Sequence, residues 1–221
     1  MRFLHRHIDY DNPKSFGNRM RNRRFQLFEE HLKRYNGNTI KILDVGGTQS
    51  FWENRGYLDK PGIHITLLNV YREPADYPNI ESTVGTGADL SRYKDNEFDI
   101  AFSNSVIEHL ETWEEKKRMA EEIKRVGKSY YIQTPNKYFP VECHFLVPFF
   151  QFLPFRLKYF LLTRTKVSKG KVLNRREALK YIKEIQLLSR RDLRRLFPQG
   201  NFKTEKFMGF NKSFIVRQIN K

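Results

Sequence analysis

Two adjacent glycines preceded by an aspartate form the most informative short motif of the sequence, Asp44-Val45-Gly46-Gly47. Glycine lets the backbone turn sharply and approach a ligand without a Cβ atom in the way. A carboxylate just before such a turn is suited to a cationic ligand group. A diphosphate would instead require backbone N–H groups at a helix N-terminus, usually with a third glycine. The motif therefore predicts a site for a ligand that carries a positive charge.

Three further polar segments are candidates for the same site. They are Asn69-Val70, Ala88-Asp89-Leu90 and Ser103-Asn104-Ser105. In a doubly wound α/β sheet the ligand binds beyond the carboxyl ends of the strands, where we expect these segments to lie. The dinucleotide pattern G-x-G-x-x-G and the phosphate loop G-x-x-x-x-G-K-[ST] are both absent from the sequence. Their absence disfavours a nicotinamide-dependent enzyme and a nucleotide hydrolase.

The elements that position these segments are predicted from apolar periodicity. Residues 15–35 alternate apolar side chains and arginines at helical spacing, and Asn36-Gly37 is a stop signal. Capping boxes begin two further helices, from Thr112 to Val126 and from Ser189 to Leu196. Short apolar runs predict strands at Thr39–Val45, His64–Val70, Phe98–Phe102 and Ser129–Thr134.

Strand runs that alternate with helices predict a parallel sheet covered on both faces. Two final runs, Phe202–Phe210 and Lys212–Ile219, are separated by little more than Asn211, so we expect an antiparallel pair. The predicted fold is a doubly wound α/β sheet of five parallel strands followed by a terminal hairpin. We expect one domain of 221 residues.

The net charge of +16 is unevenly distributed along the chain. Residues 1–36 carry +5, residues 37–136 carry −4 and residues 137–221 carry +15. A solubilising charge has no reason to segregate in this way, so the pattern predicts an anionic partner that faces the C-terminal third. A solvated basic face is the alternative.

Composition excludes several classes of protein. With 39% hydrophobic and 30% charged residues, the chain is neither disordered, collagen-like nor a coiled coil. The lone cysteine, Cys143, cannot form an internal disulfide, and the first residues lack a secretory apolar core. The longest apolar stretch, residues 145–162, contains two prolines, an arginine and a lysine, which argues against a spanning helix. We expect a cytoplasmic protein, with peripheral contact with the inner membrane surface as an option.

Residues 137–188 interrupt the alternation of strands and helices with an aromatic and basic insertion. Nine aromatic residues lie between Tyr138 and Phe160, and cations that include Arg175 and Arg176 follow them. Some of these aromatics belong to a lid packed on the core. An apolar surface beside a basic rim also suits contact with anionic lipid, or stacking on single-stranded nucleic acid.

Four motifs in order, ILDVGG, GADL, FDIAFSNSVIEHL and YYIQTPN, resemble those of the class I S-adenosylmethionine-dependent methyltransferases, and within them the small type 11 group. The resemblance covers residues 39–136 well. The segment FKTEKFMGFNKSFIVRQ is similar to the sixth and seventh strands of that fold. The resemblance implies a Rossmann-like, seven-stranded sheet in the order 3-2-1-4-5-7-6. Strand 7, about Lys212–Ile219, is expected antiparallel between strands 5 and 6.

The resemblance also implies S-adenosyl-L-methionine as the cofactor and assigns its contacts. Asp44, Gly46 and Gly47 match the motif that holds the methionine part, and Asp89, with Leu90 beside it, matches the acid that accepts a hydrogen bond from the adenine amino group. The wall after the fourth strand corresponds to Asn104, Ser105 and Val106. This sequence departs from the pattern where Thr48 and Ser50 replace glycines and where Asn69 replaces the acid that grips the ribose hydroxyls.

Two histidines are candidates for catalysis. We expect His109 at the start of the fourth helix, either as a structural residue or as a general base, and His144 just past the fifth strand. In a family of small-RNA 2′-O-methyltransferases a similar E-x-x-E-H segment and a later histidine hold a divalent metal. Here Ser105 stands in place of the first acid, so we predict no metal and keep Glu108, His109 and His144 as the weaker alternative.

The predicted activity is methyl transfer to an oxygen or nitrogen of an anionic, lipid-linked or sugar-linked acceptor. RNA is the alternative acceptor, and a non-catalytic binding module with a methyltransferase fold is a second alternative. We expect the acceptor between the N-terminal helix and the insertion, with Tyr138, His144, Arg175 and Arg176 in contact. The single domain then divides into a basic helical segment (1–36), a cofactor-binding core (37–136), the insertion on the acceptor side (137–188) and a last helix with the hairpin (189–221).

Overall fold

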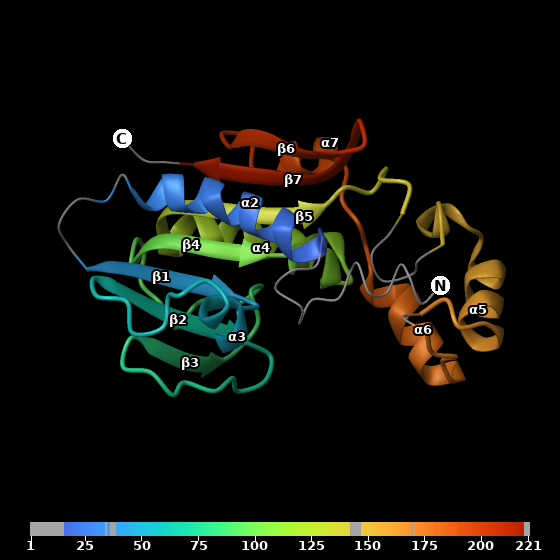
Figure 1. Cartoon of the computed structure of the whole chain (residues 1–221), viewed down its shortest axis with the longest axis horizontal. Coiled ribbons are helices and arrows are strands. Elements are labelled where there is room, and N and C mark those ends of the chain that lie inside the picture. The colour runs from blue at the N-terminus through green and yellow to red at the C-terminus, as the bar shows by residue number, and fades with distance from the viewer. Residues whose placement is uncertain (1–15, 34, 36–38, 142–146, 169, 219–221) are drawn as a thin grey trace.

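The computed structural model describes residues 16–33, 35, 39–141, 147–168 and 170–218, with the side chains of residues 16–21 excluded. Its centre is a seven-stranded sheet in the order β3-β2-β1-β4-β5-β7-β6 (Figure 1). The strands are β1 (Ile40–Val45), β2 (Ile63–Asn69), β3 (Ile80–Val84), β4 (Phe98–Asn104), β5 (Gly127–Pro135), β6 (Asn201–Phe207) and β7 (Phe210–Gln218).

Strands β1 to β5 are parallel, and β7 runs antiparallel between β5 and β6. This arrangement confirms the predicted fold class, strand order and antiparallel edge. The parallel strands place their carboxyl ends at one edge of the sheet, which is the right-hand edge in Figure 1. The polar segments that follow β1, β2 and β4 are therefore brought to the same edge.

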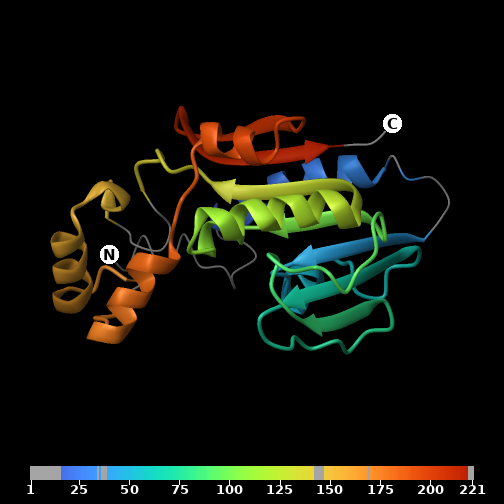
Figure 2. The ribbon, with the colours of Figure 1, turned by 180° about the vertical axis from the view of Figure 1, so that it is seen from behind.

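Helices cover both faces of the sheet. On one face lie α2 (Phe16–Leu32) and the short α3 (Gln49–Glu53), and their Phe25, Phe28 and Trp52 pack in one buried cluster with strand side chains such as Ile42 and Phe102. On the other face lie α4 (Trp113–Val126) and α7 (Arg190–Leu196), as Figure 2 shows. Alternate side chains of each buried strand enter the two cores, as the pleat of a strand requires.

Both predicted capping boxes are present. The Thr112 side chain accepts from the backbone of Glu115, and Glu115 returns a bond to the Thr112 backbone at the start of α4. Ser189 and Asp192 make the same reciprocal bonds at the start of α7. These bonds fix where each helix begins, because they satisfy backbone N–H groups that have no partner within the helix.

Three details differ from the predictions. The turn between β6 and β7 lies at Met208 and Gly209, both with positive φ, and not at Asn211, which pairs within the hairpin. His109 is not at the start of the fourth helix but in a separate 3-10 turn, η1 (Ile107–His109), because the Thr112 cap delays the helix. The third parallel strand, β3, is only partly buried, which explains why no apolar run marks it in the sequence.

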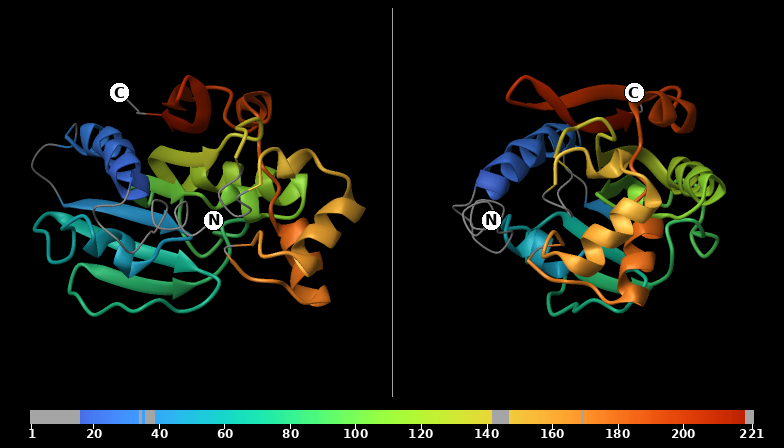
Figure 3. Two further views of the ribbon diagram at one scale, coloured as in Figure 1. Left: turned by 45° about the vertical axis from the view of Figure 1, so that its right-hand side comes forward. Right: turned by 90° about the vertical axis from the view of Figure 1, so that its right-hand side faces the viewer.

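The insertion forms a small helical unit beyond the carboxyl edge of the sheet. It contains the 3-10 turn η2 (Phe150–Phe152) and the helices α5 (Phe155–Arg164) and α6 (Arg175–Glu184). Figure 3 (right) looks onto this edge with α5 and α6 in the foreground. The unit has a hydrophobic cluster of its own, which includes Leu162, Leu173 and Ala178.

No helix within the described ranges is long and apolar enough to cross a membrane.

The α4 cap gives a direct test of how the fold is stabilised. Replacement of Thr112 by alanine removes both hydrogen bonds of the Thr112 hydroxyl, and we expect a loss of about 0.5–2 kcal/mol in the free energy of unfolding. For a chain of this size, each kcal/mol lost lowers the melting temperature by about 2–4 °C. Thr112→Ser is the control, because it keeps the hydroxyl and should melt close to the wild type. Equal melting of the alanine and serine variants would show that the cap does not stabilise α4.

Candidate functional site

The two glycines after β1 are required by the space around them. Gly46 has φ +78°, and a Cβ atom there would lie 2.3 Å from Cγ2 of Val106. A Cβ atom on Gly47 would lie 2.2 Å from Oδ2 of Asp44. Neither position can accept a side chain without displacing a neighbour, so the turn at the end of β1, here called the glycine cradle, requires both glycines.

Asp44 is buried at the end of β1 and accepts a hydrogen bond from Nε1 of Trp52 at 2.8 Å. Burial raises the pKa of this carboxyl to about 7, although the Trp52 bond and the positive charge of Arg55 act in the opposite direction. The negative charge of Glu73 raises the pKa further. A buried carboxyl in this state gains its charge most readily when a cation binds beside it.

Thr48 and Asn69 are both engaged at the rim of the cradle. The Thr48 side chain caps α3 by accepting from the backbone N–H of Phe51, which gives a structural reason for threonine where the family has glycine. The Asn69 amide donates to the Gly47 carbonyl at 3.2 Å and accepts from the Val70 N–H at 2.8 Å. Asn69 thus ties the end of β2 to the glycine turn, in the position that the sequence predicts for ribose contact.

Asp89 and Leu90 occupy different environments. Asp89 is exposed, and hydrogen bonds from Ser91 hold the pKa of its carboxyl below the ordinary value. Leu90 is fully buried in the core, and its backbone N–H donates to Glu122. The structure therefore leaves the Asp89 carboxylate open to a ligand, whereas the Leu90 side chain does not reach the predicted site.

The end of β4 supplies Asn104, Ser105 and Val106. Ser105 has φ +60°, a left-handed conformation that is uncommon for non-glycine residues. Its backbone N–H and hydroxyl both donate to Gln133 of β5, at 2.9 Å each. Gln133 accepts the hydroxyl through Oε1, which leaves the amide N–H₂ of this buried residue for other contacts.

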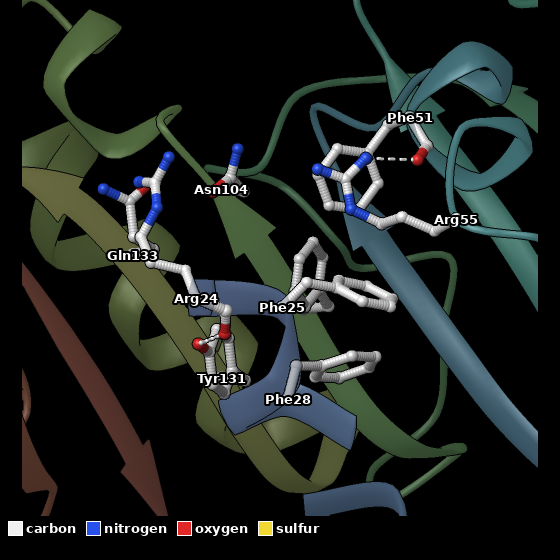
Figure 4. Close-up of a pocket in the computed structure, with 9 residues that line it drawn as sticks. Arg24, Phe25, Phe28, Phe51, Arg55, Asn104, Tyr131 and Gln133 are labelled. Carbon is white, nitrogen blue, oxygen red and sulfur yellow. Dashed lines mark hydrogen bonds between the residues drawn. The ribbon is translucent and has the colours of Figure 1, made fainter. Parts of the chain in front are cut away.

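A cleft lies over the ends of β4 and β5, between α2 and α3 (Figure 4). Its water-accessible volume is about 10 Å³, so the cleft is narrow and closely lined. Its walls are mainly aromatic, and its polar groups are two arginines and two amides. The lining residues are Arg24, Phe25, Phe28, Phe51, Arg55, Phe102, Asn104, Tyr131 and Gln133.

The two arginines of the cleft are held differently. Arg55 lies over the Phe51 ring, 3.8 Å from its centroid, and donates to the Phe51 carbonyl. The Arg24 side chain is only 14% exposed, and its Nε lies 3.6 Å from Glu205 of β6. Figure 4 shows the Arg24 guanidinium directed toward Gln133 and Asn104. A positive charge thus lies beside the end of β4, where the sequence predicts the wall of the cofactor site.

The histidine and metal candidates lie in different surroundings. His109 is exposed in η1, whereas Glu108 is fully buried and accepts from the Thr134 hydroxyl at 2.9 Å. His144, with Glu142 and Cys143, lies outside the described residues. Among the residues that are described, no group of three His, Cys, Asp or Glu side chains is placed to hold a metal.

The predicted acceptor contacts lie on the insertion. Tyr138 is 62% exposed and stacks on Phe152, with 5.9 Å between ring centroids. Arg175 and Arg176 are exposed in the first turn of α6. None of these three residues lines the aromatic cleft at β4 and β5.

Sequence reasoning missed three residues of the site: Trp52, Arg24 and Gln133. Trp52 lies on a helix of five residues, too short to show periodicity. Arg24 is one of several arginines on α2, and only the fold distinguishes the one that faces the cleft. Gln133 directly follows the buried run Tyr130–Ile132 of β5, and a polar residue inside a buried strand was the available signal.

The comparisons with known proteins bear on the fold and on the family resemblance. A family model described as "Methyltransferase domain" matches residues 56–130. An uncharacterized protein of Mycobacterium tuberculosis is 43% identical over 53 residues, which are 24% of this chain and 18% of that protein. The chain thus matches less than a fifth of the length of this relative.

Two solved structures share the fold. One is a SAM-dependent methyltransferase from Methanosarcina mazei, at 16% identity, with a TM-score of 0.50 and coverage of 84% of this chain and 94% of that chain. The other is a protein from Pyrococcus horikoshii, at 19% identity, with a TM-score of 0.53 and coverage of 98% and 97%. The family match and the shared fold confirm the predicted resemblance to class I methyltransferases, whose cofactor is S-adenosylmethionine.

The residues present fit that cofactor. The glycine cradle leaves no room for a side chain beside Asp44 and Val106, and Asp44 offers a buried carboxyl to the positively charged methionine part. Asn69 and Asp89 follow β2 and β3 at the same edge of the sheet.

The cradle predicts how alanine substitutions will act. Gly47→Ala introduces a clash with Asp44, so we expect a loss of about 1–3 kcal/mol in stability together with loss of cofactor binding. Gly46→Ala adds the strain of a positive φ to its clash with Val106. The control is Gly56→Ala, because Gly56 has φ +69° but nothing within 4 Å of its Cβ position. Calorimetric titration with S-adenosylhomocysteine should give unchanged affinity for this control. If Gly56→Ala loses as much affinity as Gly47→Ala, the glycine cradle is not the specific site of cofactor binding.

The raised pKa of Asp44 predicts a pH dependence of stability. The folded protein holds the Asp44 proton up to about pH 7, whereas the unfolded chain releases it near the ordinary value of 3.8. The contribution of this group to stability is therefore present at low pH and is lost as pH rises through about 7. Asp44→Asn mimics the neutral form, so its stability relative to the wild type should rise from pH 5 to pH 8 in urea unfolding without cofactor. A difference that is constant over this range would contradict the assignment.

Proposed function

We propose that the protein transfers a methyl group from S-adenosylmethionine to an oxygen or nitrogen of an anionic acceptor that is linked to a lipid or a sugar. The observation that carries the methyl-transfer part is the glycine cradle with buried Asp44, within a chain that matches a methyltransferase family model. The acceptor part rests on the charge and exposed surface of the insertion.

The residues of the chain bind, orient and shield the reactants. When bound, the cofactor supplies a methyl group that its sulfonium already activates. In this proposal Asp44, Gly46 and Gly47 hold the methionine part, Asn69 meets the ribose hydroxyls and Asp89 meets the adenine amino group. Alignment of two reactants is worth effective molarities of about 10⁵–10⁸ M, so positioning supplies most of the rate. His109 as a general base remains a prediction.

The aromatic cleft over β4 and β5 is the proposed place for the reacting end of the acceptor. Its rings, which include Phe28, Phe102 and Tyr131, exclude water from a site next to Asn104. Arg24 supplies a positive charge at the same place. We expected the acceptor between the N-terminal helix and the insertion. The cleft keeps the first of these walls, α2, but its opposite wall is α3.

The insertion supports an anionic, lipid-linked acceptor. Large side chains that are 42–62% exposed gather on it, namely Tyr138, Phe149, Phe152, Phe155, Leu157, Val172 and Phe160. On α5, Arg156 and Arg164 lie one turn to either side of exposed Phe160. Exposed apolar side chains flanked by cations are suited to the surface of an anionic membrane.

In the decisive assay the purified protein is incubated with methyl-labelled S-adenosylmethionine and, in turn, with lipid, glycan and RNA fractions. Transfer of the label to each fraction is measured. We expect label in the lipid or glycan fraction and none with Asp44→Asn. Label in RNA, with binding that weakens steeply as salt rises, would instead support the RNA alternative. Cofactor binding without transfer to any fraction would support the non-catalytic module.

Charge reversal on α6 tests the membrane contact. The pair Arg175→Glu and Arg176→Glu should reduce binding to phosphatidylglycerol vesicles at least tenfold, since each cation near an anionic surface contributes about 1 kcal/mol. The matched control reverses Arg190 and Arg191, which are also exposed in the first turn of a capped helix but lie on α7. Co-sedimentation measures binding, and cofactor affinity should stay within twofold in both proteins. If the control loses vesicle binding to the same extent, net charge alone explains the effect and α6 is not the contact.

A further inference from the structure

A second cavity lies inside the insertion, away from the cleft at β4 and β5. It has a volume of about 160 Å³ and lies between α5, α6, η2 and the chain that follows β5. Among the described residues, its lining contains two lysines and no acidic side chain. The lining residues are Lys137, Phe150, Gln151, Lys158, Tyr181, Ile182, Ile185, Gln186 and Leu187.

The two lysines bring like charges to one cavity. Lys137 is the second residue after β5, and Lys158 is on α5. Burial lowers the pKa of Lys158, and the positive charge of Lys137 lowers it further. Two ammonium groups placed together in a partly buried cavity repel each other unless an anion lies between them.

The hydrogen-bonding capacity of both ammonium groups is largely unused. Lys158 donates to the Gln151 carbonyl at 2.9 Å, and its other two donors have no partner among the described residues. Within the part of the chain that the structure describes, the Lys137 ammonium makes no hydrogen bond. The acid that interacts with Lys137 electrostatically is Asp192, whose Oδ2 is held in the α7 cap by Ser189.

The remaining lining defines what the anion is attached to. Gln151 is fixed by two bonds from Nε2 to the carbonyls of Lys137 and Phe139, at 3.0 and 2.8 Å. Its Oε1 is buried and has no donor among the described residues, so it can accept from a hydroxyl. Phe150, Ile182 and Ile185 add an apolar wall. The ligand therefore needs an anionic end beside a hydroxyl or an apolar portion.

We propose that this cavity binds the phosphate of a phosphate monoester, between Lys137 and Lys158. A terminal phosphate presents three oxygens to the free donors of two ammonium groups, whereas the diester of a nucleic acid backbone would have to enter as a continuous chain. The link to catalysis rests on the proposed function: the cavity would hold the phosphorylated end of the acceptor while its other end reaches toward β4 and β5. Binding of the phosphate itself does not depend on that link.

The test titrates the protein with hexyl phosphate, glucose 1-phosphate and, as neutral counterparts, hexanol and glucose. We expect saturable binding of at least one phosphate ester and none of the neutral compounds, with affinity that falls as ionic strength rises. Preference for hexyl phosphate would indicate a lipid-linked source, and preference for glucose 1-phosphate a soluble sugar phosphate. Either preference supports the site.

Variants locate the binding. Lys137→Gln and Lys158→Gln should each weaken phosphate binding at least tenfold, whereas Lys171→Gln, an exposed lysine of the same insertion, should stay within twofold. Because one of two repelling charges is removed, Lys137→Gln should not lower the melting temperature of the free protein. If Lys137 instead stabilises the fold, the Lys137→Gln variant should melt at a lower temperature than the wild type.

Two results would overturn the inference: no phosphate ester binding by the wild type, or equal loss in all three variants. A parallel titration with S-adenosylhomocysteine separates this failure from that of the proposed function. Cofactor binding without phosphate binding would refute only the proposed phosphate site. Phosphate binding without cofactor binding would refute only the proposed methyl transfer.

Discussion

The buried carboxyl of Asp44 is the constraint on which the candidate site depends. Its Oδ2 fills the space above Gly47, so the second glycine is required, and Trp52 must lie where its Nε1 reaches the same oxygen. Trp52 in turn is fully buried against Phe28 of α2, so one charge links β1, α3 and the N-terminal helix. A buried carboxyl costs stability unless it is neutral or paired. We interpret this loss of stability as the consequence of a site that is built to bind a cationic ligand.

The edge of the sheet explains why the site and the insertion lie together. Parallel strands bring the turns after β1, β2 and β4 to one edge, and the chain leaves β5 at that edge to build α5 and α6 (Figures 1 and 3). The cofactor side and the basic, aromatic surface of the insertion are therefore neighbours through topology alone. This neighbourhood is the arrangement that the proposed methyl transfer to an anionic acceptor requires.

Much of the fold could be predicted because its signals are local. The capping boxes at Thr112 and Ser189 and the apolar runs of β1, β2, β4 and β5 are such signals, and the structure confirms the elements that they predict. The strand order was implied by the family resemblance, and it is confirmed as well. The site was less predictable because its contacts are long-range: Arg24 meets the end of β4, and Gln133 meets Ser105, only after folding. Leu90 stays a predicted cofactor contact, and its side chain is fully buried in the core.

Calorimetric titration with S-adenosylmethionine tests the central claim most directly, if it is done near pH 7 in two buffers with different heats of ionisation. A cation bound beside Asp44 should lower the pKa of about 7 that this carboxyl has in the free protein, so binding should release protons and the measured heat should depend on the buffer. Saturable binding with a buffer-dependent heat, and loss of that dependence in Asp44→Asn, is the predicted result. An absence of binding at millimolar cofactor would contradict the account.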